Sequence, residues 1–208
     1  MILNEIFYSI QGEGLNIGRP AVFVRFGNCN LKCSWCDTKS TWHKDFIDNK
    51  EVDLEYVFAE IRKYPQCKHL VLTGGEPLLQ QDSISAIRRE FPQYYIEVET
   101  NGSISPRCVS DVDLLTVSHK LKNSGNAPYE LKAKNEKCIY KFVVCSEEDF
   151  ADIEEIISRY KLPSQKIYLM PEGKSEKALK SKYALISDYC MAKGYNMTTR
   201  LQILANIN

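Results

Sequence analysis

Short hydrophobic runs recur along this chain and predict six buried strands. A near-continuous run of this kind suits a strand that is covered on both faces, as in a parallel sheet. The six runs occupy residues 20–27, 69–73, 94–100, 113–117, 138–145 and 166–170. Residues 2–8, which alternate loosely between hydrophobic and polar, predict one further short strand ahead of them.

Between several of these runs, the hydrophobic spacing changes to that of a helix. Hydrophobic side chains from Leu54 to Ile61 fall on one helical face, and Asp53 precedes them as a candidate N-cap. Three further helical faces follow, in residues 84–91, 150–160 and 179–190. Gly194 is placed to end the last of these helices.

Strands that alternate with helices predict an α/β fold built on a parallel sheet with right-handed crossovers. Six strands fall short of a closed eight-stranded barrel, so we expect a partial (β/α)6 barrel of mostly parallel strands. The length of the chain suits one hydrophobic core, which predicts a single domain over residues 1–208. The polar stretch 118–136 is expected to be the most flexible segment, and residues 195–208 show no clear pattern.

Unusual residues follow the carboxyl ends of four predicted strands. A cysteine-rich loop follows residues 20–27. A triplet of glycine or polar residues comes at the end of each of the next three strands: Thr73-Gly74-Gly75, Thr100-Asn101-Gly102 and Ser118-His119-Lys120. Because ligands of parallel sheets bind beyond the carboxyl ends of the strands, we expect these residues to form one site.

Cys29, Cys33 and Cys36 form a C-x3-C-x2-C motif in the cysteine-rich loop. Three thiolates this close together can hold three irons of a four-iron four-sulfur cluster and leave the fourth iron without a protein ligand. A structural zinc site is the alternative, and it needs a fourth ligand, for which His43 and Cys67 are the candidates. The scattered cysteines are interpreted as structural thiols: Cys67, Cys108, Cys138, Cys145 and Cys190.

Charged residues also interrupt two of the buried strands. Arg25 needs an anion, which is either a structural carboxylate or a bound ligand. Glu97 and Glu99 share one face of their strand, and two carboxylates placed there must be paired or functional.

Composition narrows the function classes only a little. The 208 residues hold 27 basic and 27 acidic side chains, so no charge excess favours nucleic acid or an anionic membrane as a partner. We find no hydrophobic run that could span a bilayer and no cleavable apolar segment at the start, so the cytoplasm is the expected location.

The motifs together resemble those of the radical S-adenosylmethionine superfamily. The cysteine motif after one strand and the Gly-Gly-Glu-Pro motif after the next carry this resemblance. Within the superfamily, the chain most resembles the 7-carboxy-7-deazaguanine synthases, densely over about the first 120 residues. The matching segments are residues 8–14 (YSIQGEG), 23–31 (FVRFGNCNL), 35–38 (WCDT), 73–77 (TGGEP) and 97–102 (EVETNG).

The resemblance implies a set of cofactor-binding residues. The cysteines Cys29, Cys33 and Cys36 would hold the cluster, whose open iron takes the amino and carboxylate groups of S-adenosylmethionine. Other residues would lie along that cofactor: Trp35, Asp37, Gly74, Gly75, Ser118 and Lys120. Thr38 would be a magnesium ligand.

The family resemblance also implies a small-molecule pterin substrate. Its contacts would be Gln11, Gly12, Glu13, Arg25, Thr73 and Glu99, with Glu99 on the guanidine-like edge of the pterin or on the cofactor ribose. The implied reaction converts 6-carboxy-5,6,7,8-tetrahydropterin to 7-carboxy-7-deazaguanine and ammonia, on the route to queuosine-type bases. A 5′-deoxyadenosyl radical starts it, flavodoxin or ferredoxin supplies the electron, and the enzyme is a homodimer that needs neither nucleic acid nor membrane.

Two positions depart from the family pattern. His119 stands between Ser118 and Lys120 where proline is expected, and the tail has Gln202 in place of a substrate-binding histidine. Two other functions compete with the pterin enzyme. The first is a small radical activase that acts on a partner protein, as glycyl-radical activating enzymes do. The second is a non-enzymatic iron–sulfur or zinc module.

Overall fold

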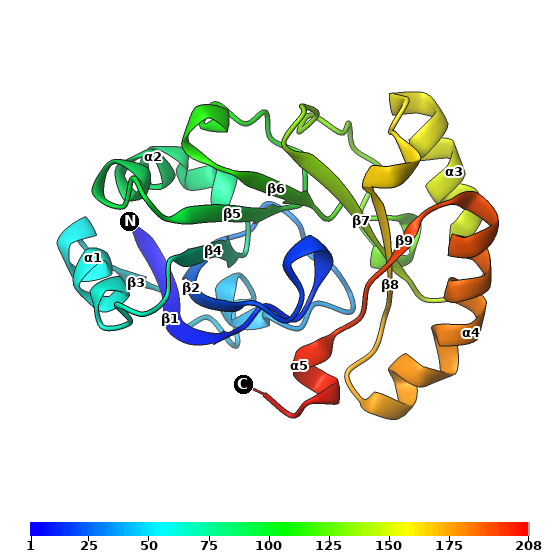
Figure 1. Cartoon of the computed structure of the whole chain (residues 1–208), viewed down its shortest axis with the longest axis horizontal. Coiled ribbons are helices and arrows are strands. Elements are labelled where there is room, and N and C mark those ends of the chain that lie inside the picture. Colours follow the sequence, from blue (N-terminus) through cyan, green and yellow to red (C-terminus); the bar gives the residue numbers. More distant parts are fainter. Residues whose placement is uncertain (208) are drawn as a thin grey trace.

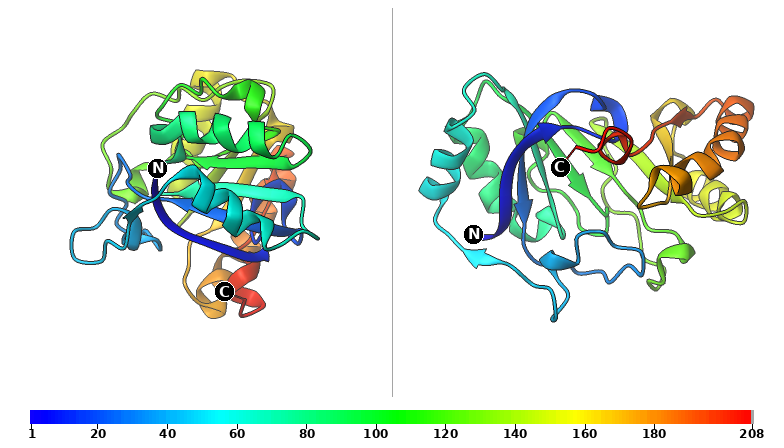
Figure 2. Two further views of the ribbon diagram at one scale, coloured as in Figure 1. Left: turned by 90° about the vertical axis from the view of Figure 1, so that its left-hand side faces the viewer. Right: turned by 90° about the horizontal axis from the view of Figure 1, so that it is seen from below.

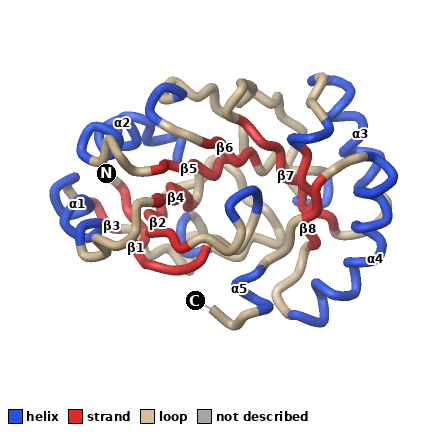
Figure 3. Tube along the Cα trace, in the orientation of Figure 1, coloured by secondary structure: helices blue, strands red, loops and turns tan. Residues whose placement is uncertain are grey.

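One curved sheet runs through the whole molecule. The computed structural model describes residues 1–207, and within them nine strands pair in the order β3-β1-β2-β4-β5-β6-β7-β8-β9. The six central strands are parallel: β2 (Pro20–Phe26), β4 (His69–Gly74), β5 (Tyr95–Thr100), β6 (Leu114–Val117), β7 (Cys138–Val144) and β8 (Ile167–Pro171). These are the six strands expected from the hydrophobic runs. Figure 3 shows them in red as one row across the molecule.

Three further strands extend the sheet at its edges. β1 (Ile2–Ile10) pairs antiparallel with β2, and the two-residue β3 (Lys50–Glu51) pairs antiparallel with β1. At the other edge, β9 (Asn196–Met197) adds in parallel to β8. The two edge strands do not pair with each other, so the sheet is an open, partial barrel of mostly parallel strands, as predicted.

The four longer α-helices cover the outside of this curved sheet (Figures 1 and 2). The five α-helices of the described residues are α1 (Leu54–Arg62), α2 (Gln81–Glu90), α3 (Asp149–Tyr160), α4 (Glu176–Lys193) and the short α5 (Leu201–Leu204). The 3-10 helices are η1 (Gly14–Asn16), η2 (Lys39–Thr41), η3 (Pro77–Gln80), η4 (Val109–Asp111), η5 (Lys122–Ser124) and η6 (Ser164–Lys166). Asp53 caps α1 by accepting a 2.7 Å bond from the Tyr56 amide, and Gly194 ends α4 with φ +69°, as expected.

The segment 118–136 differs from its prediction as a flexible stretch. Leu131 and Ala133 are fully buried, and the Tyr129 hydroxyl donates to the Asn101 carbonyl at 2.9 Å. The segment joins β6 to β7 and contains the short 3-10 helix η5 but no α-helix. It is therefore a loop that packs against the rest of the fold. Its polar composition reflects hydrogen bonds to neighbouring loops, which a composition argument cannot distinguish from bonds to water.

The main hydrophobic core lies between the sheet and the helices. Val22, Val24 and Phe26 of β2 point into it and are completely buried. The alternate residues of β2, Ala21 and Phe23, belong to a smaller cluster on the inner face of the sheet. Burial on both faces explains the near-continuous hydrophobic runs. No helix of residues 1–207 is long and apolar enough to cross a membrane.

Strand register places the chemistry-bearing loops side by side. Phe26 of β2 lies beside Gly74 of β4, and Thr100 of β5 lies beside Val117 of β6. These residues are at or next to the carboxyl ends of their strands, so the loops that follow all start at one edge of the sheet. The C-terminal tail reaches the same region, because Arg200 of the tail pairs with Asp37 in the cysteine loop after β2.

Candidate active site

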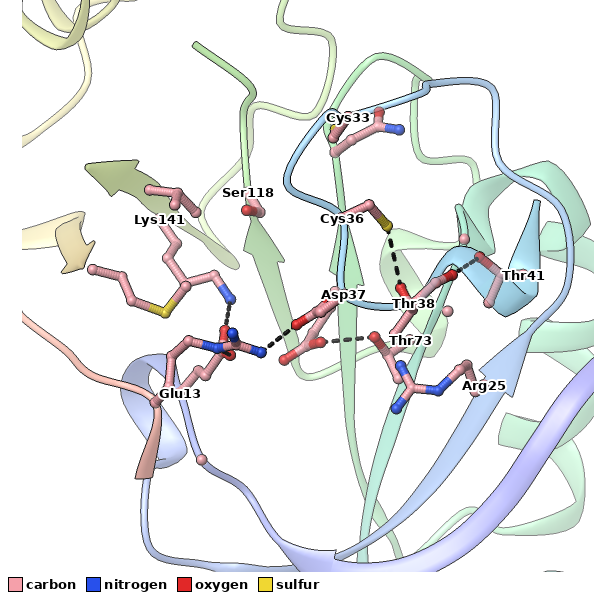
Figure 4. A pocket seen from close by; sticks show the side chains of 18 of the residues that line it. Glu13, Arg25, Cys33, Cys36, Asp37, Thr38, Thr41, Thr73, Ser118 and Lys141 are labelled. Carbon is pink, nitrogen blue, oxygen red and sulfur yellow. Dashed lines mark hydrogen bonds and ion pairs between the residues drawn. The ribbon is translucent and has the colours of Figure 1, made fainter. Parts of the chain in front are cut away.

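A cavity of about 450 Å³ opens at the carboxyl edge of the sheet (Figure 4). All the site residues expected from the sequence line it: Gln11, Gly12, Glu13, Arg25, Cys29, Cys33, Trp35, Cys36, Asp37, Thr38, Thr73, Gly74, Gly75, Glu99, Ser118, Lys120 and Gln202. The fold therefore brings them together around one space. Their individual roles stay predictions.

The glycine pair after β4 lets the cysteine loop pack against the strand end. A Cβ atom on Gly74, which has φ +132°, would lie 2.2 Å from the Phe26 carbonyl oxygen, and one on Gly75 would lie 1.9 Å from that of Asn28. The Gly75 amide donates to the Phe26 oxygen at 3.0 Å. The missing side chains thus make room for the start of the cysteine loop, while both glycines still line the cavity.

Each cysteine sulfur of the loop receives one N–H group. The backbone amide of Leu31 lies 3.4 Å from Cys29 Sγ, the side-chain amide of Asn126 lies 3.1 Å from Cys33 Sγ, and the indole N–H of Trp42 lies 3.3 Å from Cys36 Sγ. Donors aimed at sulfur favour the thiolate form that binds iron. Burial raises the pKa of Cys29 to about 11, so that thiolate needs a positively charged partner such as a metal.

The three cysteines are available to hold a four-iron cluster. All three are free and line the cavity. A cluster of this kind binds each cysteine sulfur to a different iron, so three cysteines leave one iron without a protein ligand.

The fourth ligands considered for zinc do not face these sulfurs. The Cys67 thiol contacts the carbonyls of Pro20 and His69, at the amino ends of β2 and β4 and so at the opposite edge of the sheet. His43 packs against Phe46 with ring centres 5.1 Å apart and does not line the cavity. The remaining cysteines, Cys108, Cys138, Cys145 and Cys190, are free thiols outside the cavity, as expected of structural residues.

Lys120 brings a positive charge close to the cysteine loop. Its Nζ donates to Ser118 Oγ at 2.8 Å and lies 5.5 Å from the centre of the Trp35 ring. Burial lowers the pKa of Lys120, although the nearby thiols of Cys33 and Cys29 favour its charged form. The hydrogen bond between Ser118 and Lys120 therefore holds the ammonium group in the cavity wall near the cysteine sulfurs.

His119, the departure from the family pattern, faces away from the cavity. It is buried with its ring centre 4.5 Å from that of Tyr129 and is not among the lining residues. Burial, with a smaller contribution from the charge of Lys120, lowers the pKa of His119 to about 4. The imidazole is therefore a neutral packing group at neutral pH.

Glu13 lies at the centre of an ion network on the opposite wall (Figure 4). It pairs with Lys141 of β7 and, at 3.2 Å, with Arg200 of the tail, while Gln202 donates to it at 2.9 Å. Arg200 also pairs with Asp37 of the cysteine loop. Burial alone would raise the pKa of Glu13, but the charges of Lys141 and Arg200 outweigh it and hold that pKa at about 2.

Sequence analysis missed Lys141 and Arg200. Lys141 sits within a hydrophobic run, and the argument applied to Arg25, that a buried cation needs an anion, could have identified it. Arg200 lies in the tail, where no pattern marked it. Trp42 and Asn126, the two side-chain donors to sulfur, were missed as well.

The two glutamates of β5 have different surroundings. Glu97 is completely buried and bonds to Asn16 at 2.8 Å and Thr116 at 2.7 Å, and these bonds with the nearby His69 lower its pKa in spite of burial. Glu99 lines the cavity, where it accepts a bond from Thr73 Oγ1 at 2.7 Å and burial raises its pKa. The structure thus pairs Glu97 and exposes Glu99 to a ligand.

Arg25 already has a carboxylate partner. Its Nε lies 2.7 Å from Glu5 Oε1, and its guanidinium lies 5.4 Å from the centre of the Phe7 ring. Glu5 is 52% exposed, so this pair contributes little stability and can exchange for another anion in the cavity. Arg25 therefore has a structural carboxylate partner and also lines the cavity, where a ligand can reach it.

Comparisons with known proteins agree with this geometry. The family model of the radical SAM superfamily matches residues 23–161. The 7-carboxy-7-deazaguanine synthase of Pyrobaculum aerophilum is 37% identical over 209 residues, which cover 97% of this chain and 92% of that protein. That of Halobacterium salinarum is 32% identical, covering 97% and 88%. The crystal structure of QueE from Escherichia coli has a TM-score of 0.74 at 26% identity, covering 96% of this chain and 93% of that one.

Proposed function

This chain belongs to the radical SAM superfamily and, within it, to the 7-carboxy-7-deazaguanine synthases, and we propose that it catalyses the reaction of that family. The substrate is 6-carboxy-5,6,7,8-tetrahydropterin, and the products are 7-carboxy-7-deazaguanine and ammonia. The observation that carries the proposal is the single cavity with the cysteine loop on one wall and the Glu13 network on the other. Cofactor and substrate can meet between these walls.

The cysteine wall is the cofactor side. Cys29, Cys33 and Cys36 hold the cluster, and S-adenosylmethionine lies along a wall made by Trp35, Asp37, Gly74, Gly75, Ser118 and Lys120. When bound, the cluster and S-adenosylmethionine supply the radical chemistry of the superfamily. The protein contributes the half-buried Lys120, whose ammonium suits the cofactor carboxylate.

The Glu13 wall is the substrate side. Glu13 stays ionised at all physiological pH values, so it accepts hydrogen bonds from the N–H groups of the pterin. Gln202 packs against Gly12, because its Oε1 lies 1.8 Å from the position that a Cβ atom on Gly12 would take. The missing side chain of Gly12 therefore lets Gln202 reach this wall of the cavity, where its Nε2 donates to Glu13. Gln11, Thr73 and Glu99 complete this wall of the cavity.

Arg25 and Thr38 are assigned to the substrate carboxylate. A guanidinium matches two carboxylate oxygens in one plane, and the exposed Glu5 is a weak competitor for Arg25. Thr38 lines the same cavity, with its hydroxyl oxygen 3.7 Å from Cys36 Sγ. Mg²⁺ prefers oxygen ligands and keeps several waters, so one threonine hydroxyl and the substrate carboxylate form a suitable partial shell.

Three other properties are proposed from the family. The reductant is a one-electron carrier of the flavodoxin or ferredoxin type, the enzyme is a homodimer, and the compartment is the cytoplasm. Light scattering of the purified protein tests whether it is a dimer. The reductant is tested by mixing the protein with each reduced carrier and following reduction of the cluster by visible absorption.

Anaerobic turnover tests the reaction itself. The reconstituted and reduced protein is incubated with S-adenosylmethionine, Mg²⁺ and carboxytetrahydropterin, and we expect 7-carboxy-7-deazaguanine by mass spectrometry. Cys33→Ser should lose both the cluster and the product. Cys145→Ser, a matched control outside the cavity, should keep both. A loaded cluster that yields no deazaguanine but transfers a radical to a partner protein would favour the activase instead.

A further inference from the structure

Three N–H groups point at the cysteine sulfurs of the loop, and two of them belong to side chains that lie outside the family motifs. Asn126 belongs to the loop between β6 and β7, 93 residues from Cys33, and Trp42 follows the 3-10 helix η2, six residues from Cys36. Distances of 3.1 Å and 3.3 Å are within the range of hydrogen bonds to sulfur. Both donors are therefore supplied by the fold around the cysteine loop.

The Asn126 amide is held in one orientation. Its Oδ1 accepts a bond from the Lys32 amide at 2.9 Å, and its Nδ2 donates to both Cys33 Sγ and Ser124 Oγ. A flipped amide would lose the Lys32 bond and point an oxygen at the sulfur. Lys32 lies within the cysteine loop, so Asn126 joins that loop to the β6–β7 loop and fixes an N–H group on the sulfur at the same time.

We propose that Asn126 and Trp42 set the reduction potential of the cluster by donating hydrogen bonds to Cys33 and Cys36. An N–H group next to a ligand sulfur stabilises negative charge there, and hydrogen bonds of this kind are among the main determinants of cluster potential. Reduction adds one electron to the cluster from a low-potential one-electron donor, and no bond breaks in that step. The added charge is shared with the sulfurs, so both donors favour the reduced form.

This inference rests on the proposed function only in requiring a cluster on the three cysteines. Asn126 and Trp42 then adjust the reduction potential of the cluster, but they do not bind its irons, because the three cysteines are the ligands. The natural reductant must reach the potential that these donors set, and removing a donor makes the cluster harder to reduce.

The test is a redox titration of cluster-loaded protein, followed by electron paramagnetic resonance of the reduced cluster in the absence of S-adenosylmethionine. Only loaded protein contributes to the signal, so partial occupancy does not distort the midpoint. Asn126→Ala should lower the ratio of reduced to oxidised cluster at a fixed potential by roughly three- to tenfold, where tenfold equals about 59 mV for one electron. Trp42→Phe, which keeps the ring and removes the N–H, should shift the potential in the same direction.

Asn126→Asp separates the electrostatic role from a structural one. This substitution keeps the shape and an oxygen for the Lys32 amide but places a negative oxygen next to Cys33 Sγ. The proposal predicts a larger negative shift than for Asn126→Ala, whereas a purely structural role predicts a smaller one. Asn30→Ala is the control, because Asn30 lies in the same loop and bonds to Asn101 and Ser103 through its side chain. Its potential should match that of the wild type.

The failures of the two proposals are distinguishable. Wild-type protein that takes up no iron and sulfide under anaerobic reconstitution contradicts the proposed function. Loaded Asn126→Asp and Trp42→Phe proteins whose midpoints equal that of Asn30→Ala overturn the tuning role and leave the function intact. If Asn126→Ala does not fold, these two variants still decide the question.

Discussion

Lys141→Met tests the ion network that shapes the substrate wall. The Lys141 side chain is 6% exposed and that of Glu13 is 15% exposed, so the substitution leaves the largely buried Glu13, and the cavity-lining Glu99 near it, without their ammonium. Breaking a buried ion pair costs about 3–5 kcal/mol. Arg200 and Gln202 remain bound to Glu13, which places the expected cost at the lower end, about 3 kcal/mol.

The assay is anaerobic thermal unfolding at pH 7. For a chain of this size, a loss of about 3 kcal/mol lowers Tm by roughly 6–12 °C. Lys122→Met is the matched control, because Lys122 pairs with Asp152 but is 71% exposed, and an exposed pair of this kind contributes little to stability. The double variant Lys141→Met/Glu13→Gln should be more stable than the sum of the single losses implies, since it leaves less uncompensated charge. Equal Tm losses in Lys141→Met and Lys122→Met, or strictly additive losses in the double variant, would refute this reasoning.

Three further outcomes are expected. Thr38→Ala should raise the Mg²⁺ concentration needed for half-maximal turnover by about tenfold, while the visible spectrum of the cluster is unchanged. An unaltered magnesium titration removes Thr38 from the site. Arg25→Lys should raise the substrate Kd by roughly tenfold despite the retained charge, because an ammonium cannot make a planar two-point contact, and wild-type affinity would assign Arg25 to Glu5 alone. The pKa of Glu13 is lowered to about 2, so its stabilising charge interactions are complete above its ordinary pKa of 4.5 and are lost as the pH falls towards 2. Tm measured from pH 5 to pH 3 should therefore fall less steeply in Glu13→Gln than in the wild type, and parallel curves contradict this.

Local patterns were sufficient to predict the sheet and the place of the site. The six parallel strands, β2 and β4 to β8, are largely buried on both faces, so their hydrophobic runs identify them without tertiary information. Because parallel strands place their carboxyl ends at one edge, residues as distant as Cys29 and Ser118 could be assigned to one cavity from the sequence. The motif resemblance then supplied the chemistry of that cavity.

Pairings between distant segments could not be predicted in this way. Lys141 meets Glu13 across 128 residues, and the sequence shows a buried cation there without showing its partner. The polar stretch 118–136 reads as a loose loop because its bonds to the cysteine loop, such as that of Asn126, form only in the folded chain. Arg200 illustrates the same limit, since its two carboxylate partners, Glu13 and Asp37, come from different loops.

The claim that three cysteines leave one iron open to S-adenosylmethionine is tested most directly by magnetic resonance of the reduced cluster. The experiment adds S-adenosylmethionine labelled with ¹⁵N at its amine and ¹⁷O at its carboxylate and records hyperfine couplings to the cluster spin. Direct binding of both groups to the open iron predicts couplings from both labels, in wild-type protein and in Cys145→Ser alike. A cluster spectrum that shows neither coupling at saturating S-adenosylmethionine would contradict the claim.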